Sequence, residues 1–165
     1  MQSCSQTYDA ILPAPFARLG VVGDASCVRR IDFLPREGGT FLSATNSDCV
    51  WMLAELLEQY WLDPVVSFVH LPCQAGGTAY QQRIWQALTQ IPSGQTVSYG
   101  GLARQLGSGA QAVGQACGAN PLPIVVPCHR VVAKQGRGGF MHCRDGAALD
   151  YKTWLLRHES CIRER

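Results

Sequence analysis

One stretch of this chain combines a run of core-forming residues with a cysteine and a histidine: Ile124-Val125-Val126-Pro127-Cys128-His129-Arg130-Val131-Val132. Three β-branched residues lead into a proline, and two more valines follow the arginine. This pattern predicts a buried strand interrupted at one chemical position. Pro127 fixes its own φ and favours extended geometry in the residue before it, so we expect the Cys128 thiol to be held in one orientation in the core.

The residues next to Cys128 suggest a nucleophile but do not establish one. A free cysteine has a pKa of about 8.5 and becomes reactive only beside a base or a positive charge. His129 and Arg130 are adjacent in the sequence and are of the right chemical types. Pro-Cys-His-Arg alone is equally compatible with a reactive thiol and with a packed core cysteine.

Composition sets the broad class of protein. The chain has 165 residues, 47% of them hydrophobic, which is enough for one sizeable core or two small ones. A net charge of +2 means that nucleic-acid binding would have to come from a local patch, because the whole chain has no strong field. No run of residues is long and apolar enough for a membrane span, so no membrane partner is expected.

The eight cysteines are scattered along the chain. None forms a Cys-x-x-Cys pair, and the sequence starts without a signal-peptide pattern. Scattered cysteines of this kind favour reduced thiols over a disulfide framework. We therefore expect a cytoplasmic protein.

The sequence predicts an α/β (α+β) protein with two lobes. The N-terminal lobe, residues 1–75, contains a small antiparallel sheet with one or two helices. The C-terminal lobe, residues 76–165, is mainly helical, with a helix-turn-helix and a short buried strand that carries the cysteine. Expected strands are 7–12, 17–22, 28–33 and 65–71, and a helix begins at Ser47 or Asp48 and stops before Asp63-Pro64. Residues 72–77, rich in glycine and proline, are the expected linker.

Helices dominate the predicted second lobe. Thr78 is a candidate cap for a helix that ends near Ile91, and Ser98 is a candidate cap for a short helix through Leu106. The turn 107–109 and a second short helix, 110–119, complete the helix-turn-helix pattern, which by itself is a weak signal for DNA binding. A last helix, 147–158, is expected to bury Leu149, Trp154 and Leu155, with Lys152, Arg157 and Glu159 near its polar edge.

Several further motifs surround this core pattern. They are Asn120-Pro121 before the cysteine and Trp154-Leu155-Leu156-Arg157-His158-Glu159 after it, together with the upstream segments 80–85, 91–94 and 97–100. With these motifs the chain resembles the O6-alkylguanine-DNA alkyltransferases over residues 78–160. The first lobe is similar to the variable N-terminal domain of that family only in layout.

The resemblance implies a DNA-repair reaction. Cys128 would accept an alkyl or methyl group from O6 of guanine in a single turnover, His129 would take the thiol proton through a water, and Glu159 would orient the imidazole. Asn120 would brace the helix turn against the active-site strand. A thioether product offers water no electrophilic carbonyl, so each molecule is expected to react once, with no metal and no cofactor.

The resemblance also implies the partner. The helix-turn-helix would bind double-stranded DNA through the minor groove, and the O6-alkylguanine would be flipped into the pocket. We expect the protein to act as a monomer. The residues expected to contact DNA or the base are Tyr99, Gln111, Ala112, Gly114, Cys117, Arg130, Val131, Phe140 and Lys152. Without the resemblance, Tyr99 would be interpreted as a core tyrosine and Asn120 as a turn cap.

Three features depart from the family pattern, all on the DNA or base side of the site. Gln111 stands where the family typically has an arginine that fills the gap left by the flipped base. The turn 107–109 is short. In segment 139–152, Gly139-Phe140 is followed by Met141-His142-Cys143-Arg144 and not by the usual pair of glycines. Substrate identity and DNA affinity are the properties that these changes affect.

Other sites and functions stay open at this level. Cys4, Cys27, His70 and Cys73 could form a structural zinc site, although their spacing is irregular, and His142-Cys143 is a poor metal pair because adjacent residues rarely both ligate. Two alternative functions are a damaged-DNA binding protein without chemistry and a cysteine alkyl acceptor for a small molecule. The presence of Cys128 argues for chemistry.

Overall fold

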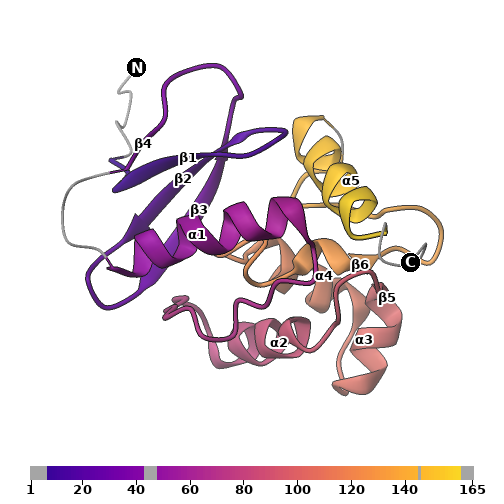
Figure 1. Ribbon diagram of the computed structural model, residues 1–165. Helices are drawn as coiled ribbons and strands as arrows, with labels where there is room; N and C mark the ends of the chain where they lie inside the picture. The colour runs from indigo at the N-terminus through magenta and orange to yellow at the C-terminus, as the bar shows by residue number, and fades with distance from the viewer. Residues whose placement is uncertain (1–6, 43–47, 145, 161–165) are drawn as a thin grey trace, which may run out of the picture. The chain divides into compact units, whose positions relative to one another are not determined.

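The computed structural model describes residues 7–42, 48–144 and 146–160, and its chain forms two compact units (Figure 1). The first comprises residues up to Leu62 together with Val66–Gln74, and the second comprises Asp63–Val65 and the chain from Ala75 onward. Each unit has its own helices and strands.

The first unit contains an antiparallel sheet in the order β3-β2-β1-β4. Its strands are β1 (Ala10–Pro13), β2 (Arg18–Gly23), β3 (Val28–Leu34) and β4 (Phe41–Leu42). Register pairs Ala10 with Val21 and Val21 with Ile31, and all three side chains are buried. The three expected hairpin strands are confirmed, and the short edge strand β4 was not predicted.

Helix α1 (Asp48–Leu62) ends where Asp63-Pro64 was expected to stop it. It buries Cys49, Val50, Leu53, Leu57 and Tyr60, whereas Trp51 is 51% exposed. Trp51 therefore lies outside the buried face of this helix, although it is a large apolar residue.

The expected strand 65–71 was also wrong. These residues form turns, closed in part by the bond from the Leu71 amide to the Phe68 carbonyl (3.0 Å), and Val65 and Val69 are exposed. Only Cys73, further on, makes an isolated bridge to Val28. A run of β-branched residues does not make a strand when no neighbouring strand offers hydrogen-bond partners.

The second unit begins with α2 (Ala79–Thr89), whose first turn has a complete capping box. Thr78 accepts from the Gln81 amide (3.2 Å), and the Gln81 side chain accepts from the Thr78 amide (2.9 Å). The apolar stripe of this helix buries Ile84, Trp85 and Leu88. Trp85 also donates to the Ala116 carbonyl at 2.8 Å, which joins α2 to the helix-turn-helix.

The helix-turn-helix is formed by α3 (Tyr99–Gln105) and α4 (Ala110–Gly118). Ser98 caps α3 by accepting from the Gly101 amide, as expected. Gly107 has φ +61° and turns the chain out of the helix. The hydroxyl groups of Ser108 and of Tyr80 in α2 share a hydrogen bond of 2.7 Å, in which either can be the donor. The turn is therefore fastened to the body of the unit.

The stretch around Cys128 is not the interrupted strand that its sequence predicts. Ile124 has φ +75°, which no strand residue adopts, and the Val126 amide bonds back to the Leu122 carbonyl (2.8 Å). Cys128–Arg130 forms one turn of 3-10 helix, η1, and only β6 (Val131–Val132) is a strand. β6 pairs in parallel with β5 (Val97–Ser98), a strand that was not predicted. The cysteine is buried, as expected, but it precedes the strand.

Helix α5 (Ala147–Ser160) is the last element of the described chain. The set of residues that it buries differs from the expected set. Its buried residues are Lys152, Leu155 and Glu159, so two charged side chains that were placed at the polar edge lie inside. Leu149 and Trp154 are only half-buried. In the described part of the chain, no helix is both long enough and apolar enough to cross a membrane.

Candidate active site

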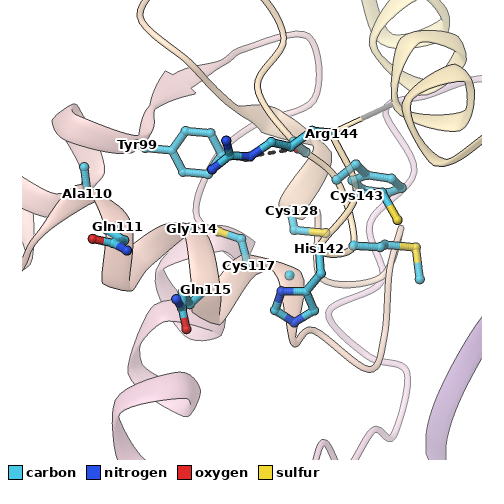
Figure 2. Close-up of a pocket in the computed structure, with 14 residues that line it drawn as sticks. Tyr99, Ala110, Gln111, Gly114, Gln115, Cys117, Cys128, His142, Cys143 and Arg144 are labelled. Atoms are coloured by element: carbon cyan, nitrogen blue, oxygen red, sulfur yellow. Dashed lines mark hydrogen bonds between the residues drawn. The ribbon is translucent and has the colours of Figure 1, made fainter. Parts of the chain in front are cut away.

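Cys128 lies at the floor of a cavity of about 560 Å³ in the second unit (Figure 2). The side chain is only 3% exposed, so a reacting group must enter the cavity to reach the sulfur. One wall is the exposed face of α4, and the opposite wall is the loop from Gly139 to Arg144. Of the residues expected to contact DNA or the base, five line this cavity: Tyr99, Gln111, Gly114, Cys117 and Phe140.

Asn120 fixes the backbone that leads to the cysteine. Its side-chain amide donates to the Val126 carbonyl (2.8 Å), and its oxygen accepts from the Leu122 amide (3.0 Å). Burial raises the pKa of the Cys128 thiol, while a hydrogen bond from Asn120 and the nearby charge of Lys152 act in the opposite direction. Cys128 is therefore held as a thiol near neutral pH, beside groups that favour its ionised form.

Behind the cysteine, His129 and Glu159 form a buried pair. The His129 Nε2 atom lies 2.8 Å from Glu159 Oε1, and the two side chains are almost completely buried. Burial lowers the pKa of His129, so the ring is neutral at pH 7. Because Glu159 is an acceptor, Nε2 carries the hydrogen and Nδ1 holds the lone pair. Nδ1 is buried and has no hydrogen-bond partner among the described residues.

Arg130, which does not line the cavity, completes this cluster. It donates to both Glu159 oxygens, from Nε at 3.0 Å and from the second terminal nitrogen at 2.8 Å, and to the Ile91 carbonyl at 2.5 Å. Burial by itself would raise the pKa of the Glu159 carboxyl, but the bonds from His129 and Arg130 hold it well below its usual range. Glu159 is thus an anion at all ordinary pH values.

Lys152 is a buried cation that ties the active-site strand to the loop. Its ammonium donates to the Val131 carbonyl (2.7 Å) and to the Gly139 carbonyl (2.9 Å), and the side chain is 0% exposed. The Tyr99 hydroxyl donates to the same Gly139 carbonyl at 3.1 Å. Together these two side chains hold the start of the Gly139–Arg144 loop over the cavity.

Comparison with known proteins identifies the family. A model of the 6-O-methylguanine DNA methyltransferase DNA-binding domain matches residues 79–161, half of the chain. The chain belongs to this family.

Individual relatives agree with this assignment. The methylated-DNA–protein-cysteine methyltransferase of Shigella flexneri is 44% identical over 129 residues, which cover 77% of this chain and 71% of the relative. Its counterpart from Haemophilus influenzae is 33% identical over 158 residues, which cover 92% of this chain and 86% of the relative. A Mycobacterium tuberculosis structure of the same family, in complex with DNA, superposes with a TM-score of 0.74 at 32% identity, covering 92% of each chain.

Four expected contact residues of this methyltransferase-family chain do not line the cavity. Arg130, Val131 and Lys152 are buried and do not line it, so their expected contact with DNA or the base stays a prediction. Ala112 is exposed on α4 but does not face the cavity. The buried pairs of Arg130 and Lys152 depend on tertiary packing, which local polarity does not reveal.

Both walls of the cavity include residues that were not named as expected contacts, although the segment after Phe140 was expected on the base side of the site. Ala110, Gln115 and Gly118 on α4 and the loop residues Met141, His142, Cys143 and Arg144 also line the cavity. The unusual composition of the segment after Phe140 was the signal in the sequence that could have identified these loop residues as lining the cavity. Of the zinc candidates, Cys4 lies outside the described residues, and the described residues contain no group of three or more His, Cys, Asp or Glu side chains arranged to hold a metal.

Replacing Lys152 by methionine is expected to remove a pH-dependent contribution to stability. Burial lowers the pKa of Lys152 from 10.5 to about 8, so the unfolded chain binds the extra proton between these values. The wild-type free energy of unfolding therefore gains up to about 1.4 kcal/mol per pH unit from this group as pH rises through that window. Urea unfolding across the window should show this gain in wild type and not in Lys152→Met. Exposed Lys134→Met is the control, and identical pH slopes in all three proteins would contradict the assignment.

Proposed function

We propose that this protein repairs DNA by direct transfer of a methyl or larger alkyl group from O6 of guanine to Cys128. The observation that supports this most strongly is the buried arrangement of thiol, neutral imidazole and carboxylate at the floor of a cavity large enough for a base. Family membership and the DNA complex of the similar Mycobacterium tuberculosis protein point to the same reaction.

The His129 geometry accounts for how the thiol loses its proton. Nε2 donates to Glu159, so Nδ1 is the nitrogen with a lone pair, and it has no partner among the described residues. A water between Nδ1 and the Cys128 sulfur would pass the proton to the ring, and Glu159 would stabilise the imidazolium that forms. Arg130 keeps Glu159 ionised, so the proton moves from the Cys128 thiol to His129 and not to the carboxylate.

The bond changes then balance without a further reactant. The Cys128 thiolate attacks the alkyl carbon, a carbon–sulfur bond forms, and the bond from carbon to O6 breaks. The electron pair stays on the guanine, and the proton taken up by His129 is available to neutralise it. The thioether cannot be hydrolysed in the way that a thioester can, so the protein reacts once.

The depth of Cys128 determines how DNA must bind. Cys128 is 3% exposed, so its sulfur cannot reach O6 of a base stacked inside a duplex, and the base must rotate out into the cavity. The helix-turn-helix, with α4 forming one wall of the cavity, would dock in the minor groove, and one protein molecule would act alone. The reaction requires a reduced thiol, in keeping with a cytoplasmic location.

Intact-mass spectrometry tests this function. The protein is incubated with a duplex that contains a single O6-methylguanine and, in parallel, with the same duplex without the methyl group. One added methyl per protein is expected only with the modified duplex, and peptide mapping should place it on Cys128 and not on Cys117 or Cys143, which line the same cavity. Binding of the modified duplex without any mass gain would instead support a non-catalytic damage-binding protein.

A further inference from the structure

The loop opposite α4 is built around a tight turn. The Phe140 amide donates to the Cys143 carbonyl and the Cys143 amide to the Phe140 carbonyl, both at 2.8 Å. Between them Met141 and His142 have φ values of +50° and +63°. Two consecutive left-handed residues inside such a pair are the geometry of a type I′ turn, which holds the residue after it in a defined direction.

The turn is seated on the end of α4. A Cβ atom placed on Gly118 would lie 2.5 Å from His142 Nδ1, so the imidazole rests where any larger residue would have a side chain. At its other end the loop is held through the Gly139 carbonyl, which accepts from Tyr99 and Lys152. Arg144 therefore follows a loop that is fastened at Gly139 and at His142.

The charges around the cavity are distributed unevenly. The α4 wall contributes Ala110, Gln111, Gly114 and Gln115, none of which is charged. Of the described residues that line the cavity, Arg144 is the one with a permanent charge. It is exposed, and in Figure 2 its side chain extends from the loop toward the side of the cavity where Tyr99 lies.

We propose that Arg144 is a positioning residue that binds a backbone phosphate of the strand whose base occupies the cavity. This inference rests on the proposed repair function. When a base enters a deep cavity, its sugar and phosphates remain at the mouth, and a guanidinium matches a phosphate both in charge and in the geometry of its paired donors. Arg144 is at the mouth, whereas Cys128 is at the floor.

The other role for a cation here is recognition of the adduct itself, for example an alkyl group that bears a carboxylate. The position of Arg144 argues against that role. Arg144 is exposed, while the alkyl group must reach the sulfur of Cys128, a residue that is 3% exposed. A phosphate outside the cavity is the anion that the exposed guanidinium can reach without being buried.

Salt dependence of duplex binding tests the proposal. Binding to a duplex with one O6-methylguanine is measured at several salt concentrations for wild type, Arg144→Gln and Arg36→Gln. Loss of one phosphate contact should reduce the slope of log affinity against log salt by about one unit in Arg144→Gln. Arg36→Gln makes the same change in net charge at an exposed residue that does not line the cavity, and its slope should match wild type.

The transfer reaction provides the second readout. Arg144→Gln should slow transfer from the duplex by about tenfold, the cost of one charge-assisted hydrogen bond. Reaction with free O6-benzylguanine, which has no phosphate, should lose much less. Gln111→Arg in the Arg144→Gln background returns a cation to the opposite wall and should restore part of the slope, since both residues line the cavity.

Each other outcome has a definite meaning. An unchanged salt slope in Arg144→Gln, or equal losses on the duplex and on the free base, overturns the phosphate contact. A larger loss with O6-carboxymethylguanine than with O6-methylguanine in the same duplex would assign Arg144 to the adduct and overturn it as well. If wild type transfers an alkyl group from neither the duplex nor the free base, the proposed function fails. The salt slope of binding does not depend on transfer, so it tests the Arg144 phosphate contact separately.

Discussion

Cys128→Ala is expected to abolish alkyl transfer to the protein completely. Cys128 is the thiol that lies beside His129 and receives the hydrogen bond from Asn120. The neighbouring Cys117 is not expected to replace it. Burial is the largest cause that raises the pKa of Cys117, to about 12 in the wild type, and it persists in the variant, so Cys117 stays a protonated thiol and a poor nucleophile. The hydrogen bond from Asn120 that favours the ionised form of Cys128 is not among the influences on Cys117. Intact-mass spectrometry with methylated duplex and with O6-benzylguanine should show no mass gain for the variant.

Binding measurements show whether Cys128→Ala has lost only its chemistry. The alanine is smaller than the thiol and occupies the floor of the cavity, so the variant should still bind the methylated duplex. Cys73→Ala, an exposed cysteine of the first unit, is the matched control and should gain one methyl as wild type does. A methyl group that still appears on Cys128→Ala would mean that another residue is the acceptor.

Glu159→Gln is expected to lower both stability and the rate of transfer. Glu159 is 1% exposed and accepts hydrogen bonds from His129 and from two nitrogens of Arg130. Removing its charge leaves the Arg130 guanidinium buried without a counterion, and breaking a buried pair in this way costs about 3–5 kcal/mol. The imidazolium on His129 also loses the anion that stabilises it, so the rate should fall by at least about a hundredfold.

The pH dependence of this stability loss has a definite sign. The folded-state pKa of Glu159 is held below its unfolded value, so its contribution is complete above about pH 4.3 and is lost as pH falls toward the lowered pKa. Denaturant unfolding should therefore show the largest difference between wild type and Glu159→Gln near neutral pH, and the difference should shrink in acid.

Two comparisons make the Glu159 prediction specific. Glu58→Gln changes the same chemical group on the exposed face of α1 and should alter stability by less than about 0.5 kcal/mol. Transfer rates are compared per folded molecule, using free O6-benzylguanine so that DNA binding does not enter. If Glu159→Gln unfolds more easily but its folded fraction reacts at the wild-type rate, Glu159 stabilises the fold and has no part in activating the thiol.

Features that depend on neighbouring residues were well predicted from the sequence. The Thr78 cap, the Ser98 cap and the glycine turn at Gly107 require only side chains and backbone within a few residues of each other. The helices around them therefore begin and end near the expected positions. His129 stands next to Cys128 for the same local reason. The first-lobe hairpins follow from alternating apolar residues and turn signals.

Tertiary structure decided the features that depend on distant partners. The run 124–132 has the composition of a strand, but the chain reverses at Ile124, and only Val131–Val132 finds a neighbouring strand, β5. Lys152 and Arg130 look like surface residues in the sequence, yet carbonyl groups and Glu159 compensate for their burial. The Met141–Arg144 wall of the cavity exists because His142 packs on Gly118. Sequence alone thus determined the helices and the adjacent cysteine and histidine. The buried charges and the shape of the cavity come from contacts between residues far apart in the chain, whose energies no local pattern encodes.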